Sequence, residues 1–233
     1  MNSRFRQILV CSLILAIAFP AWAQNSPTFG LSKSSIKMGP VYIGLIRDAA
    51  DCIFKKNYTG ASAKLDEADK IQPGLFDSLL LRADVYAETK DYGKARDLYQ
   101  QAIKIQPNNF WPQFNLAELM LTEKKYKEAR ESFQALMISD KYKESVDYKV
   151  VVCLLGEGDM PKAKETLDKM KFPSDSGAYY YANAAYEFAQ GHKDKGMQWI
   201  QSGDSIFSSV KNSQLYDVLA DMGWVTVRPP SDK

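Results

Sequence analysis

The chain has 233 residues, with 30 lysines and arginines, 28 aspartates and glutamates and one histidine. Residues 1–23 hold two of the arginines and no acidic residue, so the basic and acidic residues balance in the rest of the chain. Nucleic-acid binding needs a concentrated cationic surface that releases counterions. The composition therefore argues against a nucleic-acid partner, and the length suits one domain or one repeat array.

The amino terminus has the pattern of an export signal. Arg4 and Arg6 precede an apolar stretch over residues 8–19, and Ala21-Trp22-Ala23 has the small residues of a cleavage site. We expect residues 1–23 to be a signal peptide, cleaved near Ala23/Gln24. The mature chain would then be exported, either to the periplasm or out of the cell.

A lipoprotein signal is the alternative, because Cys11 follows Ile-Leu-Val. Cys11 lies inside the apolar stretch, however, and Val10 stands where a small residue is expected, so export without lipid attachment fits better. After residue 23 no apolar run approaches the roughly 20 residues that cross a bilayer. We expect no membrane span in the mature chain.

Residues 24–40 are polar and contain several serines, glycines and prolines, so we expect this segment to be flexible. A pattern with a period of 34 residues follows. It is carried by four columns of residues that share one register: Ala49, Ala83, Ala117; Ala61, Ala95, Ala129, Ala163; Leu65, Tyr99, Phe133, Leu167; and Tyr58, Tyr92, Tyr126.

Each column has a mechanical role in a pair of helices. Two helices approach to about 8–10 Å only where their side chains are small, so Ala83 of the first helix should face Ala95 of the second. Bulky Tyr99 then fills the space beside that contact, since protein interiors are closely packed. Residues 90–93 supply the turn, and Pro107 ends the second helix because it has no amide hydrogen.

This pattern resembles the tetratricopeptide repeat (TPR), which has the same length. The resemblance covers residues 41–210 and implies an all-α fold, a right-handed α-α superhelix (TPR solenoid) of about five helix-turn-helix repeats plus a C-terminal capping helix. The repeats are predicted at 42–75, 76–109, 110–143, 144–177 and 178–210, the capping helix at 211–224 and a tail at 225–233.

Two details depart from the regular pattern. The β-branched run Lys149 to Cys153 could form a strand, but the repeat phase favours a helix. In the last repeat the turn is one residue shorter, and Gly196 stands where alanine is expected.

In this family the first helices line a concave groove that holds a protein or peptide segment, and the resemblance places one set of residues there. Their aromatic members offer the large contact area typical of binding hot spots, although several could instead pack between repeats. The predicted groove residues are Asp84, Trp111, Phe114, Asn115, Glu118, Tyr148, Lys149, Tyr179 and Tyr186.

One subclass of the family grips a C-terminal carboxylate with a clamp of Lys, Asn and Arg. Here Asn115 and Lys149 stand at two of the clamp positions. Leu80, Asp84 and Ser145 occupy the others, and Asp84 would repel a carboxylate. A segment with apolar anchors and some positive charge fits this groove better.

No arrangement of residues indicates catalysis. The only histidine, His192, lies in a turn rich in Gly and Lys, and the sequence has no phosphate-binding loop and no zinc-type cysteine spacing. We therefore expect no enzyme, no cofactor and no metal. Asn57-Tyr58-Thr59 matches a glycosylation sequon, but we interpret it as an ordinary repeat turn.

Cys52 and Cys153 follow the signal peptide and could pair in an oxidising compartment. They fall on the first helices of the first and fourth repeats. Three layers of about 10 Å separate these helices, whereas the α-carbons of a disulfide lie within about 7 Å of each other. We expect two free, largely buried thiols.

The sequence favours an exported scaffold or adaptor that binds a protein or peptide partner in its groove, as a monomer or weak oligomer. A structural subunit of an envelope assembly or secretion complex is the first alternative. A carbohydrate-binding platform, with sugars stacked on Trp111 and residues 179–181, is a weaker one.

Overall fold

A computed structural model of the chain describes residue 32 and residues 39–136, 140–209 and 211–226. This part of the chain forms eleven α-helices and no strand. They are α3 (Pro40–Phe54), α4 (Tyr58–Ile71), α5 (Phe76–Glu88), α6 (Tyr92–Ile105), α7 (Phe110–Thr122), α8 (Tyr126–Ala135), α9 (Asp140–Gly156), α10 (Met160–Asp168), α11 (Ala178–Ala189), α12 (Lys193–Phe207) and α13 (Ser213–Asp221).

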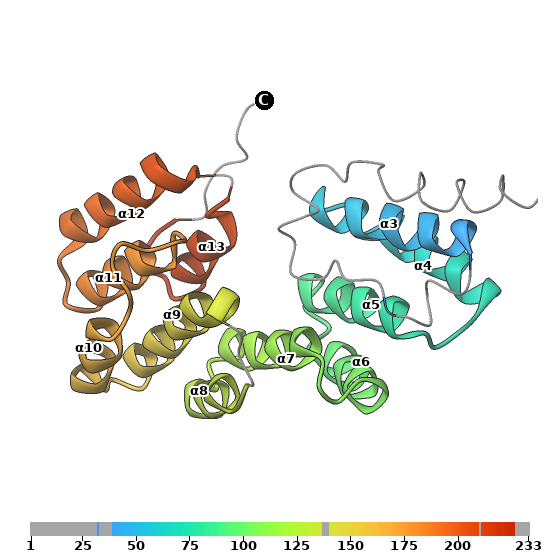
Figure 1. The fold of residues 1–233 in the computed structure, drawn as a ribbon, viewed down its shortest axis with the longest axis horizontal. Coiled ribbons are helices and arrows are strands. Elements are labelled where there is room, and N and C mark those ends of the chain that lie inside the picture. Colours follow the sequence, from blue (N-terminus) through green and yellow to red (C-terminus); the bar gives the residue numbers. More distant parts are fainter. Residues whose placement is uncertain (1–31, 33–38, 137–139, 210, 227–233) are drawn as a thin grey trace, which may run out of the picture.

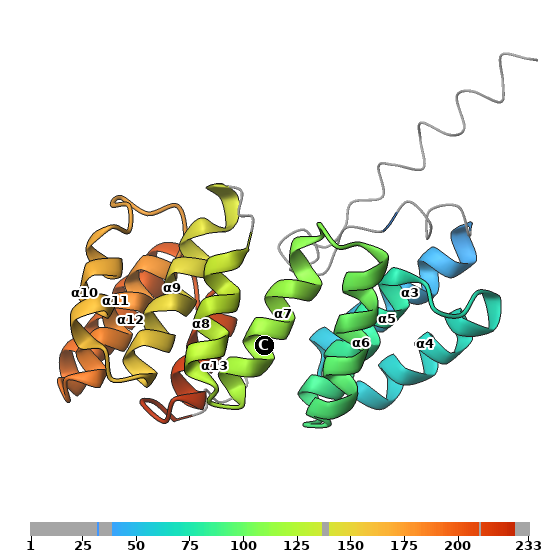
Figure 2. The same cartoon turned by 90° about the horizontal axis from the view of Figure 1, so that it is seen from below.

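The first ten of these helices form five antiparallel pairs, from α3 and α4 to α11 and α12 (Figure 1). Each pair packs against the next, and the stack curves into an arch with α3 to α6 in one arm and α9 to α12 in the other. Figure 2 shows the same succession of pairs from below. The predicted all-α solenoid is confirmed. The signal peptide predicted at 1–23 and most of the predicted tail lie outside the described residues.

All five pairs share one three-residue turn, so the prediction of a shorter turn in the last repeat is wrong. Its second residue has a left-handed backbone, as in Lys90 (φ 67°). In the second pair, the amide of Asp91 donates to the carbonyl of Tyr86 at 2.8 Å and the amide of Lys90 to that of Ala87 at 3.0 Å, which is a Schellman motif. The equivalent residues of the other turns are Lys56, Lys124, Gly158 and Gly191.

The last residue of the turn begins the next helix. The Asp91 side chain accepts a hydrogen bond from the amide of Lys94 and so caps α6. Asn57 and Asp159 cap α4 and α10 in the same way. Asn57, the asparagine of the sequon, therefore acts as the N-cap of α4. Because the turn has the same length in every pair, the pairs have a similar geometry.

The alanine columns lie where the helices of a pair cross. Ala83 and Ala95 are completely buried, and Tyr99 beside them is 3% exposed. The same holds for Ala117 and Ala129 in the next pair. These methyl-sized contacts let the backbones approach closely, as the sequence predicts.

A further column joins neighbouring pairs through ion pairs. Arg96 of α6 contacts Glu123 in the turn after α7 at 2.5 Å, and Arg130 of α8 contacts Glu157 after α9 at 2.6 Å. Both arginines and both glutamates are 34 residues apart. A second Arg130–Glu157 contact of 3.1 Å makes that ion pair bidentate.

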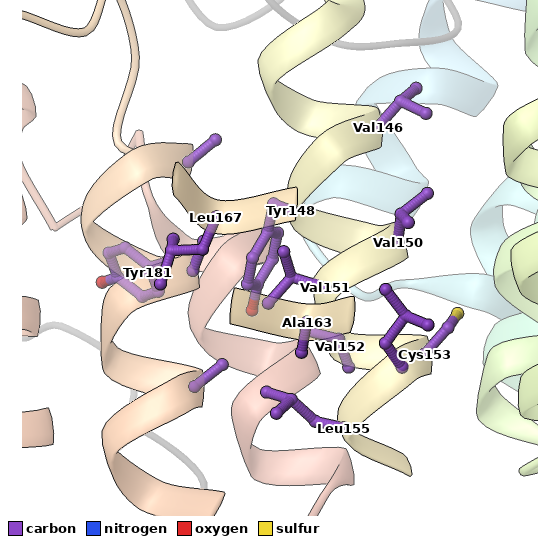
Figure 3. Packing of buried hydrophobic residues seen from close by; sticks show 14 of the residues in the cluster. Val146, Tyr148, Val150, Val151, Val152, Cys153, Leu155, Ala163, Leu167 and Tyr181 are labelled. Atoms are coloured by element: carbon purple, nitrogen blue, oxygen red, sulfur yellow. The ribbon is translucent and has the colours of Figure 1, made fainter. Parts of the chain in front are cut away.

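The β-branched run is helical and lies in the middle of α9. Val150, Val151 and Val152 are all buried, as is Cys153 next to them (Figure 3). Because α8, α10 and α11 all pack against α9, a helical segment that is apolar on several sides is stable here.

Cys52 and Cys153 both carry free thiols. Cys153 is buried, and burial raises the pKa of its thiol to about 12. Cys52 on α3 is only partly buried, which is less than the sequence led us to expect.

One residue of the predicted flexible segment 24–40 is held against the array. Ser32 is buried, and its amide and hydroxyl donate to Asp77 Oδ2 at 3.0 and 2.9 Å. Asp77 is itself buried in the first turn of α5, where its carboxylate needs such donors. Among the described helices, none is long and apolar enough to cross a membrane.

The glycine at position 196 has a packing reason. A Cβ at Gly196 would lie 2.5 Å from the Phe188 ring, whereas a Cβ at Gly93 of α6 would have its nearest neighbour at 4.0 Å. We expect Gly196→Ala to destabilise the fold by about 1–3 kcal/mol through overpacking. Gly93→Ala should be neutral or stabilise it by about 0.5 kcal/mol through helix propensity. Urea denaturation measures both, and equal effects would contradict this packing.

Candidate protein-interaction cleft

The inner side of the arch contains a cleft of about 380 Å³. Its residues come from α3 and from every helix from α5 to α9, from the turns that follow α5 and α7, and from α13 and Met222 after it. Figure 1 shows α13 on the inner side of one arm, facing the arm that holds α3 and α5. The cleft therefore joins both arms to the C-terminal helix.

Asp84 of α5 lies at the floor of the cleft. The Tyr99 hydroxyl of α6 and the Asn115 side-chain amide of α7 both donate to Asp84 Oδ1, at 2.7 and 2.9 Å. Part of the residue is exposed, but its carboxyl lies deep among protein atoms, and this burial raises its pKa to about 7. The charges of Glu88 and Glu118 act in the same direction.

A second polar pair links α7 to α9. Lys149 is 4% exposed, and its ammonium forms an ion pair with Glu118. The same ammonium lies 5.9 Å from the centre of the Tyr148 ring. A lysine this deeply buried needs a carboxylate partner, so this pair and Asp84 with its donors hold neighbouring repeats together beneath the cleft.

Helix α13 forms the opposite wall. The Tyr148 hydroxyl of α9 donates to the Leu215 carbonyl at 2.8 Å, and Tyr216 and Leu219 are buried in the core shared with α9 and α11. Asn212, just before α13, donates to Asp204 at 3.0 Å and so fixes the start of the helix to α12. The C-terminal helix therefore packs onto the inner face of the arch as well as closing the core.

The cleft-facing side of α13 is a separate stripe. Its residues follow the helical spacing i, i+3, i+4, i+7, and they are Gln214, Asp217, Val218 and Asp221. The buried stripe that contains Tyr216 and Leu219 lies on the other side of the helix. Both sides of α13 are thus in use, one for packing and one for the cleft.

Three carboxylates line the edge of the cleft, namely Glu88 of α5 and Asp217 and Asp221 of α13. The Tyr58 hydroxyl donates to Glu88 at 2.9 Å. Asp221 is exposed as a whole, yet partial burial of its carboxyl, followed by the charges of Asp217 and Glu88, raises its pKa. All three residues are exposed, and Lys90 and Lys124 line the same cleft.

Four of the nine predicted groove residues line this cleft. They are Asp84, Asn115, Glu118 and Lys149, and they bond to one another or to the array. The five aromatic residues do not line it.

Trp111 and Phe114 belong to an aromatic cluster at the start of α7. Phe110 stacks on Tyr142 of α9 at 4.7 Å, and Trp111 meets the same ring edge-on at 5.0 Å. Phe114 is 6% exposed and contacts Phe133 at 5.4 Å. Removing the Phe114 ring would open a cavity in the core, at a cost of about 3–5 kcal/mol, and would not report on binding.

The remaining aromatic residues also pack inside the array. Tyr148 is fully buried beneath α13. Tyr179 and Tyr186 are partly buried and pack against the same core, with Tyr179 6.1 Å from Trp199. Large rings at these positions fill the space between pairs, so the expected row of aromatic residues along the groove does not line the cleft.

The sequence analysis missed most of the lining, including the residues of α13, Glu88 and three tyrosines, which are Tyr92, Tyr99 and Tyr126. The spacing of residues 214, 217, 218 and 221 was a usable signal, because it marks a second face on a helix interpreted only as a cap. His192 lies outside the cleft and contacts Glu187 at 2.8 Å. Among the described residues, no group of three or more His, Cys, Asp or Glu is placed to hold a metal ion.

A profile of the tetratricopeptide repeat family matches residues 86–142. The fold is similar to that of PilF from Pseudomonas aeruginosa, with a TM-score of 0.59, 16% identity, and coverage of 82% of this chain and 89% of that one. Residues 86–142 thus match the family profile, and the described chain has the fold of a tetratricopeptide repeat solenoid.

Other solved structures have a similar solenoid. MamA from Desulfovibrio magneticus RS-1 has a TM-score of 0.54 and 19% identity, covering 72% of this chain and 99% of that one. A tetratricopeptide repeat protein from Parabacteroides merdae has a TM-score of 0.53 and 18% identity, covering 80% and 75%. At these identities the similarity concerns the fold alone. No curated protein matches the sequence.

The buried carboxyl of Asp84 predicts a pH-dependent stability. Its pKa of about 7 in the folded chain lies above the ordinary value of 3.8. The folded state therefore holds more protons between these values, and its contribution to stability falls as the pH rises from about 4 to about 7. Asp84→Asn keeps an acceptor for Tyr99 and Asn115 and cannot ionise. We expect this variant to melt higher than the parent at pH 8 and equally at pH 4.

Circular dichroism melting curves at pH 4, 6 and 8 measure this difference. Asp97→Asn, on the exposed surface of α6, is the matched control and should show no such trend. A gain for Asp84→Asn that is independent of pH would contradict an ionisable group buried at the cleft floor.

Proposed function

We propose that the chain is an exported scaffold without catalytic activity, and that it binds a segment of a partner protein in the cleft. The observation that carries this proposal is the cleft itself. Its deep polar groups already bond to one another, as Asp84 does with Tyr99 and Asn115, while its edge exposes apolar and charged side chains. Such a surface suits reversible binding of a chain segment.

The size of the cleft favours a short segment over a folded domain. A volume of about 380 Å³ lies at the small end of the range of ligand pockets and accommodates a few side chains. Ile53 of α3 and Val218 and Met222 at the C-terminal helix provide apolar contact from both sides. A peptide or helix that anchors two or three side chains fits this shape.

The chemistry of the cleft supports binding more than catalysis. Lys149 is held by Glu118, and the Asp84 carboxyl is held by two donors. A general acid or base must reach the reacting atom, and these groups face one another instead. The single histidine is at another place on the surface.

Export is supported by the sequence of residues 1–23, with its basic start, apolar stretch and small residues before Gln24. A scaffold in the periplasm or outside the cell would meet its partner there. The two free thiols are compatible with this location because they are far apart in the array and form no disulfide with each other.

Site-specific photo-cross-linking tests the binding surface directly. A photoreactive phenylalanine analogue at Gln214 or Thr122, two exposed positions that line the cleft, is compared with one at Gln101 or Lys127, two exposed positions outside it. In cells that make the protein naturally, we expect a discrete adduct from the first pair and none from the second. Mass analysis of the recovered chain should show Gln24 at its amino terminus.

Two results would count against the proposal. Adducts of equal yield at all four positions would indicate surface collisions. A discrete adduct only from the outer positions would favour a structural subunit that assembles through other surfaces. A chain recovered with residues 1–23 still attached would contradict the proposed export.

A further inference from the structure

A second surface of α5, outside the cleft, holds one of the chain's own residues. The amide of Ser32 donates to Asp77 Oδ1 at 3.2 Å and to Oδ2 at 3.0 Å, and its hydroxyl donates to Oδ2 at 2.9 Å. Ser32 is 6% exposed and Asp77 5%, and neither residue lines the cleft. A residue 45 positions earlier in the chain is thus held on the helix as a bound peptide would be.

Asp77 lies on the same side of α5 as the residues that line the cleft. A helix of 3.6 residues per turn places positions seven and eleven apart on one face, and Asp84 and Glu88 follow Asp77 at these spacings. On one flank Leu81 belongs to the core shared with α3, and on the other Leu80 belongs to the core shared with α6 and α7. Asp77 therefore faces the inner side of the array, between α3 and α7.

This position is close enough to the cleft for one segment to reach both. A rise of about 1.5 Å per residue puts Asp77 about 10 Å along the helix from Asp84, which lines the cleft. An extended chain advances about 3.3 Å per residue, so about three residues span the interval. Ser32 occupies the far end of that path.

The contact also defines the kind of ligand that fits. A buried carboxylate is costly unless donors reach its oxygens, so Ser32 can leave only if other donors replace it. The backbone amide and the hydroxyl of a single residue serve both oxygens here. An extended segment that presents a serine supplies the same two donors, whereas proline has neither.

We propose that the inner face of α5 at Asp77 is a binding site for an extended segment that presents a serine, and that the chain's own N-terminal segment occupies this site through Ser32. The site is separate from the cleft and does not depend on binding there. A partner segment that continues past Asp84 along α5 has to displace Ser32. The N-terminal segment is then a built-in competitor for part of the inner face.

The test offers the segment as a free peptide to a chain that cannot hold its own. Ser32→Pro removes the amide hydrogen and the hydroxyl together. A fluorescein-labelled peptide of residues 25–38 is titrated with the mature chain, either parent or Ser32→Pro, and fluorescence anisotropy measures binding. Because a short tether gives an effective concentration of about 1 mM, we expect a Kd below about 0.1 mM for Ser32→Pro and binding about tenfold or more weaker for the parent.

Two controls locate the site on the array. Adding Asp77→Asn to Ser32→Pro should weaken peptide binding by about tenfold, because hydrogen bonds to a carboxylate are lost. Adding Asp97→Asn, on the exposed surface of α6, should change it by less than about twofold. A peptide with the same Ser32→Pro change should not bind. Ser32 precedes the first described helix, so circular dichroism should show the helices of the parent in Ser32→Pro.

The outcomes separate this inference from the proposed function. Peptide binding to Ser32→Pro that is no tighter than to the parent, or that is absent at about 1 mM peptide, would overturn the inference. An equal loss from Asp77→Asn and Asp97→Asn would also overturn it, because the peptide would then bind elsewhere. None of these results bears on the cleft, which cross-linking from Gln214 and Thr122 tests by itself.

Discussion

The shape of the inner face depends on how closely the two helices of each pair approach. Ala83 against Ala95 and Ala117 against Ala129 are completely buried and offer only methyl groups at the crossing. A larger side chain there would separate the helices and change the angle at which the next pair stacks. Because the same turn follows every first helix, small differences would add up along the array, and the two walls of the cleft would no longer face each other.

Within this array, polar groups connect neighbouring repeats beneath the cleft. Asp84 connects α5 to α6 and α7, and the Glu118–Lys149 pair connects α7 to α9. Buried ionic groups of this kind specify one arrangement more than they stabilise it. Their place at the floor leaves the edge of the cleft, with its exposed charged and apolar side chains, as the part that the proposed partner would contact.

Much of the fold could be predicted because the same packing contacts and the same turn recur in successive repeats. Alanines at 34-residue spacing mark the first four pairs, Pro107 follows the end of α6, and even the β-branched run in α9 follows the phase. Gly196 is the instructive departure, since the alanine expected there would meet the Phe188 ring. The ion pairs Arg96–Glu123 and Arg130–Glu157 also follow the repeat and could have been read from it.

The candidate site was harder to predict, because a position in the repeat does not say whether a side chain faces the cleft or the next pair. Tyr148 is fully buried, and its hydroxyl donates a hydrogen bond to α13 instead of lining the cleft. The position of α13 could not be predicted either, since the sequence indicates a capping helix but not which face of the array it covers. That choice depends on contacts far apart in the chain, such as Tyr148 with Leu215.

The central claim is that α13 packs on the inner face and forms one wall of the cleft. Amide hydrogen exchange of α13, compared between the parent and Tyr148→Phe, tests this most directly. The account predicts slow exchange in the parent and about tenfold faster exchange in the variant, whose Leu215 carbonyl loses its buried donor, with α5 and α6 unchanged. Exchange of the α13 amides in the parent as fast as in an unstructured peptide would contradict it.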